Sequence, residues 1–148
     1  MTDPDLITGA VDLHAHTAPD LVKRFGNDID LARHAYEADM AGVVVKSHVV
    51  PTAGRVDLVN KAVGDNMLYG GIACNGTVGG LNYDAVETAL ELGADIVWLP
   101  TTWSTNHASQ ARRAGVEHFV GQRVPDLDED IPVAHDGKVT TATQRIIN

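Results

Sequence analysis

Val43-Val44-Val45 is an uninterrupted run of β-branched residues that directly follows Gly42. Such a run is typical of a strand buried on both faces, as in a parallel sheet that helices cover. Before it, Asp28 is expected to cap a helix over residues 29–40, and after it residues 55–63 have the apolar spacing of a second helix. A helix, a buried strand and another helix in succession predict consecutive βα units.

The same alternation continues on both sides of this unit. Further strands are expected at residues 9–15, 71–74 and 96–99, and a further helix at residues 83–92, which Asn82 would cap. The pattern predicts an α/β fold with parallel strands, in one domain over residues 1–148.

The length restricts the architecture. A closed (β/α)₈ barrel normally needs about 250 residues, so the four to five units expected here correspond to a partial, TIM-like barrel. A small open α/β sheet is the alternative. Residues 9–107 carry the βα units, and residues 108–148 are expected to be an irregular C-terminal segment.

Within that segment, residues 107–114 suit a short helix and residues 120–132 an exposed loop. Asp136-Gly137 is a turn signal, and the tail to Asn148 is expected to begin another helix.

Composition excludes several classes of function. The net charge of −9 is unsuited to nucleic acid or to an anionic membrane surface, and no stretch approaches the roughly 20 apolar residues of a membrane span. The acidic N-terminus lacks the pattern of a signal peptide, and Cys74 is the only cysteine, expected to be a small buried residue. We therefore expect a cytoplasmic protein without a disulfide.

Asp12-Leu13-His14-Ala15-His16 places two histidines at i and i+2 at the end of the first expected strand. Side chains alternate along a strand, so Asp12, His14 and His16 would share one face. Two imidazoles on one face are a ligand pair for Zn²⁺ or a similar divalent ion, and Asp12 either orients one of them or bonds the backbone.

Polar residues also follow the other expected strands, and in parallel α/β folds the site lies at these carboxyl ends. Lys46 and His48, again at i and i+2, end the second strand. Lys46 is open to three interpretations: a carbamylated metal bridge, a cation for an anionic substrate, or a base with a lowered pKa. His48 is a candidate metal ligand or acid/base.

Weaker candidates for substrate contact lie in the loops: Asp20, Arg24, Asn75 and His107. Gly76-Thr77-Val78-Gly79-Gly80 has the composition of a phosphate-binding loop, but it matches neither the Walker pattern nor GxGxxG.

Two of these motifs resemble known families. Residues 11–17, followed by Asp20, resemble the opening motif of the amidohydrolase superfamily and of the polymerase-and-histidinol-phosphatase family, and residues 41–48 resemble the second motif of the latter. Over residues 9–107 the chain is most similar to the N-terminal half of uncharacterised amidohydrolase-like proteins. The resemblance implies that His14 and His16 bind the first metal, and that His48 binds a metal or the substrate.

The chain also departs from those families. Lys46-Ser47 replaces Thr-Asp, Asn75 stands where a bridging Glu is expected, and the later histidines and the final Asp have no evident counterpart. In amidohydrolases the bridging Lys follows the fourth strand, whereas Lys46 ends the second.

The sequence thus predicts a metal-dependent hydrolase acting on a small-molecule amide, ester, lactone or phosphate ester. Zn²⁺ is the first choice of cofactor, with Mn, Fe or Ni as alternatives. His14, His16, His48 and Lys46 are the candidate ligands, and Lys46 and His48 the candidate catalytic groups. The rival hypotheses are a catalytically incomplete metal-binding half-barrel and an anion-binding α/β domain without metal. A half-barrel leaves strand edges uncovered, so a homo-oligomer or a partner that completes the barrel is also expected.

Overall fold

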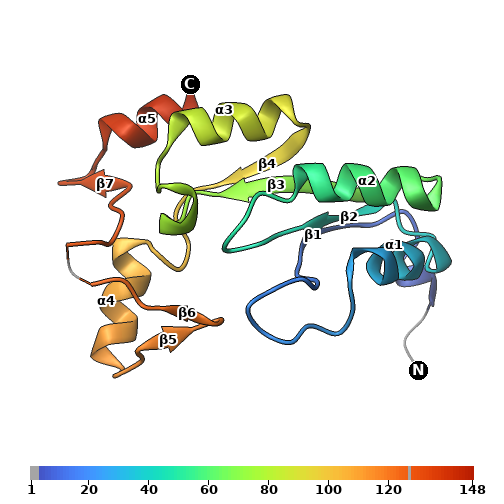
Figure 1. The fold of residues 1–148 in the computed structure, drawn as a ribbon, viewed down its shortest axis with the longest axis horizontal. Helices are drawn as coiled ribbons and strands as arrows, with labels where there is room; N and C mark the ends of the chain where they lie inside the picture. The colour runs from blue at the N-terminus through green and yellow to red at the C-terminus, as the bar shows by residue number, and fades with distance from the viewer. Residues whose placement is uncertain (1–3, 127) are drawn as a thin grey trace.

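The fold is a four-stranded parallel sheet with helices between consecutive strands (Figure 1). The computed structural model describes residues 4–126 and 128–148. The sheet order is β1-β2-β3-β4, and all three pairings are parallel. Its strands and intervening helices are β1 (Val11–Ala15), α1 (Asp28–Glu37), β2 (Gly42–Val45), α2 (Ala53–Val63), β3 (Leu68–Ala73), α3 (Tyr83–Glu91) and β4 (Ala94–Trp98). These are consecutive βα units of a partial TIM-like barrel, as the sequence predicted.

The remaining elements are short. A 3₁₀ turn precedes β1 and another follows β3: Pro4–Ile7 and Gly76–Val78. After β4 come α4 (Thr105–Arg113), β5 (His118–Phe119), β6 (Gln122–Arg123), β7 (Ala134–His135), β8 (Lys138–Val139) and α5 (Thr141–Ile147). Figure 1 shows α4 and the β5–β6 hairpin at the end of the molecule away from α1. None of the helices in the two described ranges combines the length and apolar character needed to cross a membrane.

The core lies between the sheet and its helices. Val43 and Val45 of β2 pack with Ala32 of α1 and Val56 of α2, all 4% exposed or less. A second cluster joins Ile72 of β3 to α3. Since side chains alternate along a strand, Val43 and Val45 face the helices, and Lys46, the next residue, points to the opposite face of the sheet.

Helix α1 begins one residue earlier than the sequence suggested. Its N-cap is Asn27, whose side chain accepts from the backbone of Ile29 and Asp30, so the prediction that Asp28 is the cap was wrong. Asp28 instead lies inside the first turn, buried against Arg55. The helix ends at Glu37 rather than at residue 40 because Asp39 adopts φ +51°, which a helix cannot contain.

Strand β3 begins at Leu68, three residues before the expected start, and it contains two glycines. A Cβ at Gly70 would lie 2.5 Å from the Cα of Ala53, and one at Gly71 would lie 2.5 Å from the Trp98 ring. Glycine normally argues against a strand, but here it permits the close approach of α2 on one side and of Trp98 on the other.

The C-terminal segment is more ordered than predicted. Residues 120–132 were expected to form an exposed loop, but they contain β6, and Val124 packs against Ala108 and Ala111 of α4. The Asp136-Gly137 turn is confirmed: both residues have positive φ (48° and 75°), and they connect β7 to β8.

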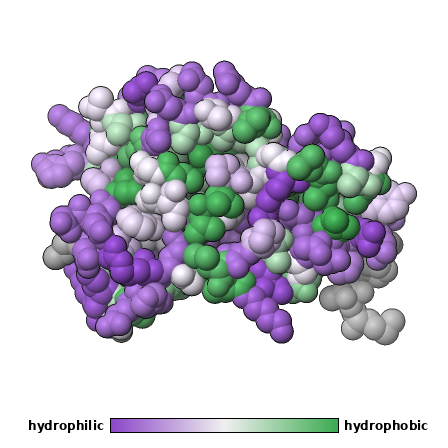
Figure 2. All heavy atoms as spheres, in the orientation of Figure 1, coloured by the Kyte–Doolittle hydropathy of each residue, from purple (hydrophilic) through white to green (hydrophobic). Residues whose placement is uncertain are grey.

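The sheet has two free edges within the described residues, since β1 pairs only with β2 and β4 only with β3. Leu13 of β1 is 62% exposed, and Figure 2 shows hydrophobic side chains reaching the surface in the middle of the face in view. The predicted self-association remains a prediction.

Candidate functional site

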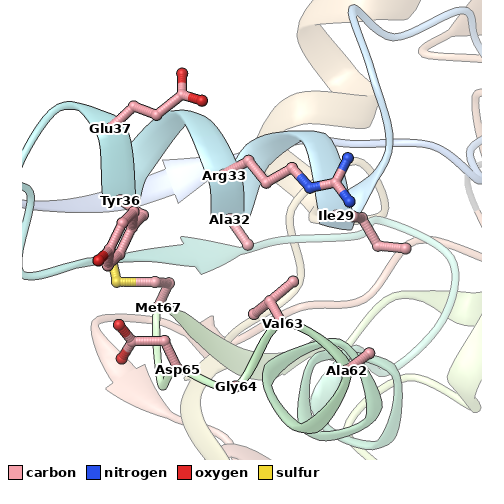
Figure 3. A pocket seen from close by; sticks show the side chains of 10 residues that line it. All are labelled: Ile29, Ala32, Arg33, Tyr36, Glu37, Ala62, Val63, Gly64, Asp65 and Met67. Atoms are coloured by element: carbon pink, nitrogen blue, oxygen red, sulfur yellow. The ribbon is translucent and has the colours of Figure 1, made fainter.

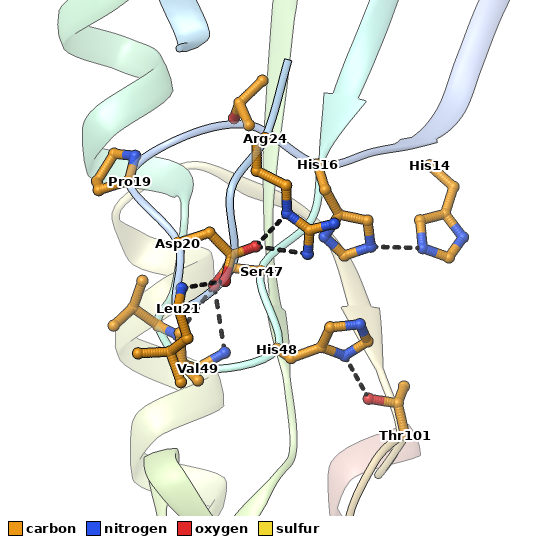
Figure 4. A network of polar contacts seen from close by, with 12 residues as sticks. His14, His16, Pro19, Asp20, Leu21, Arg24, Ser47, His48, Val49 and Thr101 are labelled. Carbon is orange, nitrogen blue, oxygen red and sulfur yellow. Dashed lines mark hydrogen bonds and ion pairs between the residues drawn. The ribbon is translucent and has the colours of Figure 1, made fainter. Parts of the chain in front are cut away.

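His14 and His16 converge at the carboxyl end of β1. Their Nε2 atoms are 3.1 Å apart (Figure 4), which confirms that the two side chains share a face. Two nitrogen ligands of a tetrahedral Zn²⁺ ion, each about 2.0–2.1 Å from the metal, lie roughly 3.3–3.4 Å apart. Asp12 bonds the backbone: its Oδ1 accepts from the N–H of His14 at 2.9 Å. The pair therefore has the separation of two metal ligands.

The carboxyl end of β2 adds His48 and Lys46 to the same place. The His48 ring stacks on that of His16, with centroids 4.9 Å apart and planes 23° from parallel. The Lys46 ammonium lies over the face of Trp98, 5.2 Å from the ring centroid, and the Trp98 ring is 6.5 Å from that of His14. The strand-end residues predicted to meet in space thus do so.

Asn75 and Thr101 hold His48 from the ends of β3 and β4. Asn75 is fully buried, and its Oδ1 accepts from the backbone N–H groups of Thr101 (2.9 Å) and Trp103 (3.3 Å). These contacts fix the orientation of the amide, so Nδ2 donates to the carbonyl of His48 and to Thr101 Oγ1, each at 3.0 Å. Because every polar atom of Asn75 is bonded within the protein, its role is to position neighbours rather than to touch a substrate.

This network also holds the ring of His48. Thr101 Oγ1 lies 3.0 Å from His48 Nδ1, and the Thr101 hydroxyl also donates to Asn75 Oδ1 at 3.3 Å. His48 is therefore engaged through Nδ1, and Nε2 is the ring nitrogen that this network does not use.

The loop after β1 brings an ion pair to the cluster. Arg24 Nη2 is 2.6 Å from Asp20 Oδ2, and the two side chains are 18% and 5% exposed. Figure 4 shows both beside His16. The structure therefore places Asp20 and Arg24 at the site, but as partners of each other.

The electrostatic environment keeps the imidazoles neutral. Burial lowers the pKa of His14 and of His16 below the usual 6.5, with Lys46 adding to the effect on both rings. Burial, followed by the charge of Lys46, lowers the pKa of His48 to about 4. Burial also lowers the pKa of Lys46. Neutral imidazoles are the form that binds metals, and burial favours this form although Asp12 and Asp20 act in the opposite direction.

The structure does not bring His107 to this cluster in any contact it shows. His107 lies in α4, and its ring packs at 4.8 Å from that of Phe119. In residues 76–80, the backbone N–H groups of Val78, Gly79 and Gly80 donate to backbone carbonyls of the same turn. The phosphate-loop interpretation of this segment remains a prediction.

Two other features lie apart from the cluster. Cys74 is buried, as expected, and burial raises the pKa of its thiol to about 11, so it is an unreactive structural residue. A cavity of about 540 Å³ lies between α1 and the end of α2 (Figure 3). Its lining includes Tyr36, Glu37 and Met67, where α1 ends and β3 begins, at the opposite end of the sheet from the histidines.

Sequence reasoning missed the roles of Trp98 and Thr101. Neither residue is among the candidate site residues that the sequence indicated. Both residues lie at the carboxyl end of β4, and this position was the signal that could have indicated them. The sequence does not show which side chains at that strand end point toward β2.

We expect the stability of the metal-free protein to decrease as the pH falls from 6.5 to 4. In this window the unfolded chain binds a proton at His48 that the folded chain, with a pKa of about 4, does not bind, so protons favour unfolding. For a half-buried ring screened by solvent, the loss is about 1–2 kcal/mol. Urea unfolding at several pH values measures it.

His48→Gln is the control for this experiment, because carboxylates also titrate in the same range. The variant should lose less stability than the wild type between pH 6.5 and 4. Parallel curves for the two proteins would contradict the expected pKa.

The fold and this cluster define the chain as an α/β protein of parallel βα units that gathers histidines and a lysine at the carboxyl ends of its strands. The chain belongs to the family described as family of unknown function (DUF6282), which matches residues 9–148. No curated protein and no solved structure matches it.

Proposed function

We propose that this chain is a metal-dependent hydrolase of the amidohydrolase-like type, with His14 and His16 as ligands of a divalent ion. The observation that carries the proposal is the 3.1 Å separation of their Nε2 atoms at the carboxyl end of β1. Zn²⁺ is the preferred ion because both donors are imidazole nitrogens, and Mn, Fe or Ni are the alternatives. Such an ion, when bound, supplies an activated water and polarises a carbonyl or phosphoryl oxygen.

The residues of the chain fit this ion in charge state as well as in spacing. The lowered pKa values leave a lone pair on each imidazole at neutral pH. Without an ion, the two Nε2 atoms at 3.1 Å must share one proton in a hydrogen bond, and a divalent ion replaces that bond by two ligand bonds. His48, held by Thr101 through Nδ1, acts on the substrate or on the ion through Nε2.

The ligand set also supports a second candidate. Within residues 4–126 and 128–148, no group of three or more His, Cys, Asp or Glu side chains has the arrangement of a metal site. A catalytic Zn²⁺ usually has three protein ligands. A chain that binds the ion through two histidines and is completed by another segment or subunit is therefore the alternative, and the free edges of β1 and β4 favour it.

The proposed setting is the cytoplasm, where a single cysteine remains reduced, and the proposed ligand is a small molecule. A second copy of the chain, or another chain, is the proposed partner at the free strand edges.

Zinc binding by the purified protein tests the proposal. We expect about one Zn²⁺ per chain, and we expect His14→Ala/His16→Ala to weaken binding by more than about 100-fold, since even residues that only orient a ligand contribute 10- to 100-fold. Isothermal titration calorimetry with Zn²⁺ and metal analysis after dialysis measure both effects.

His34→Ala is the matched control, because His34 lies on α1 and stacks on Phe25, away from the cluster. It should bind Zn²⁺ like the wild type. A wild type that retains no Zn²⁺, Mn, Fe or Ni, or a double variant that binds as well as the wild type, would contradict the proposal. Hydrolysis of p-nitrophenyl acetate or phosphate by the Zn²⁺-loaded chain then separates the complete enzyme from the incomplete subunit.

A further inference from the structure

Lys46 is a buried cation without an acidic partner in the described part of the chain. The residue is only 5% exposed, at the start of the loop that follows β2. Within residues 4–126 and 128–148, the contact that the structure shows for its Nζ is a cation–π contact with the face of Trp98, 5.2 Å from the ring centroid. The other Lys and Arg side chains of the first two βα units that form ion pairs have carboxylates within 2.8 Å. Lys46 differs from them in being both enclosed and uncompensated.

The nearby carboxylates are already engaged elsewhere. Asp20 is held by Arg24 at 2.6 Å and also accepts from the backbone of Leu21. Asp12 accepts from the backbone N–H of His14. The positive charge of Lys46 lowers the pKa of all three histidines, while Asp12 acts in the opposite direction on His14 and Asp20 on His16 and His48.

A buried ammonium favours an anion as its ligand. The ring of Trp98 stabilises the charged form of Lys46 through a cation–π contact, and it leaves the amine's N–H donors free for oxygen acceptors. Because Trp98 also adjoins His14, an oxygen bound by Lys46 would lie at the same cluster as the imidazole pair.

We propose that Lys46, seated on Trp98, binds an oxyanion group of the substrate, a carboxylate or a phosphate. This inference rests on the proposed function in one respect, because only that function makes the oxyanion part of a substrate. Binding at Lys46 itself does not require the metal, so it can be measured on the metal-free protein.

Titration of metal-free protein with inorganic phosphate and, separately, with acetate tests the proposal. The readout is the ¹⁵Nζ signals of the four lysines, together with the dissociation constant. We expect one of the two anions to shift the Lys46 signal at millimolar concentrations, and Lys46→Met to weaken its binding about tenfold or more, as for the loss of one charge-assisted hydrogen bond. Lys46→Arg should retain binding within about threefold because it keeps the charge.

Two control variants separate this proposal from the metal hypothesis. Lys61→Met removes an exposed lysine, 72% accessible and paired with Asp57, and should leave anion binding unchanged. His14→Ala/His16→Ala should also retain anion binding while it loses Zn²⁺. Loss of Zn²⁺ binding alone thus bears on the proposed function and not on Lys46.

The choice of anion assigns the substrate class, since phosphate binding indicates a phosphate ester and acetate binding a carboxylate. If neither anion shifts the Lys46 signal of the wild type, or if Lys46→Met binds as tightly as the wild type, the proposal is overturned. The ¹⁵Nζ measurement needs no variant, so it decides the question even if Lys46→Met does not fold.

Discussion

Asp28→Ala is expected to lower the free energy of unfolding by about 3 kcal/mol, the lower end of the range for breaking a buried ion pair. Asp28 is 5% exposed, and its carboxylate lies 2.8 Å from Arg55 Nε in an ion pair and accepts from Arg55 Nη2 at 2.9 Å and from the hydroxyl of Thr17. The variant leaves the guanidinium of Arg55, only 19% exposed, without its counter-charge. Urea unfolding followed by circular dichroism at 25 °C measures the change.

Asp57→Ala is the matched control, because it removes an aspartate from an exposed pair on α2. The side chains of Lys61 and Asp57 are 72% and 53% exposed, so this change should alter stability by less than about 1 kcal/mol. In addition, Asp28→Ala/Arg55→Met should be more stable than Asp28→Ala alone, since it removes the unpaired charge. Equal losses in Asp28→Ala and Asp57→Ala would contradict the structural role of the buried pair.

This pair matters for the site as well as for stability. Arg55 of α2 also donates to Thr17, which directly follows His16, and to the carbonyl of Pro19 at 3.3 Å. The loop that carries Asp20 and Arg24 is thereby anchored to the second βα unit. The site is therefore built on an interaction between residues far apart in the sequence.

Asn75→Ala is the second variant with a large expected effect, a loss of about 3 kcal/mol. The substitution leaves the N–H groups of Thr101 and Trp103 and the carbonyl of His48 without their partner, and each unsatisfied buried group costs about 1–3 kcal/mol. Because water can partly reach the three groups, we expect the loss of stability to lie near the lower end of the sum of their costs. Urea unfolding measures the stability, and the ¹⁵N shifts of His48 report whether its tautomer changes.

Asn106→Ala provides the control, since Asn106 lies on the exposed side of the first turn of α4. It should change stability by no more than about 0.5 kcal/mol and leave the His48 signals unchanged. If Asn75→Ala retains both wild-type stability and the wild-type tautomer, then Asn75 does not position His48.

The fold was predictable where the hydrophobic pattern was strong. The valine run of β2 and the cap of α3 at Asn82, which accepts from the N–H of Ala85, were expected from local chemistry and are observed. The predictions were wrong where a distant element compensates for a poor local preference. Gly70 lies in a strand because α2 needs the space, and Val124 is buried because α4 packs over it.

The sequence by itself determined the succession of βα units, the shared face of His14 and His16, and the return of each strand end to one edge of the sheet. These follow from side-chain alternation and from the polarity of parallel strands, which are properties of the local backbone. Only the tertiary structure decided that Lys46 rests on the ring of Trp98 and that Thr101 holds the ring of His48. Those contacts join residues more than 50 positions apart, and their geometry depends on how neighbouring strands are staggered and packed.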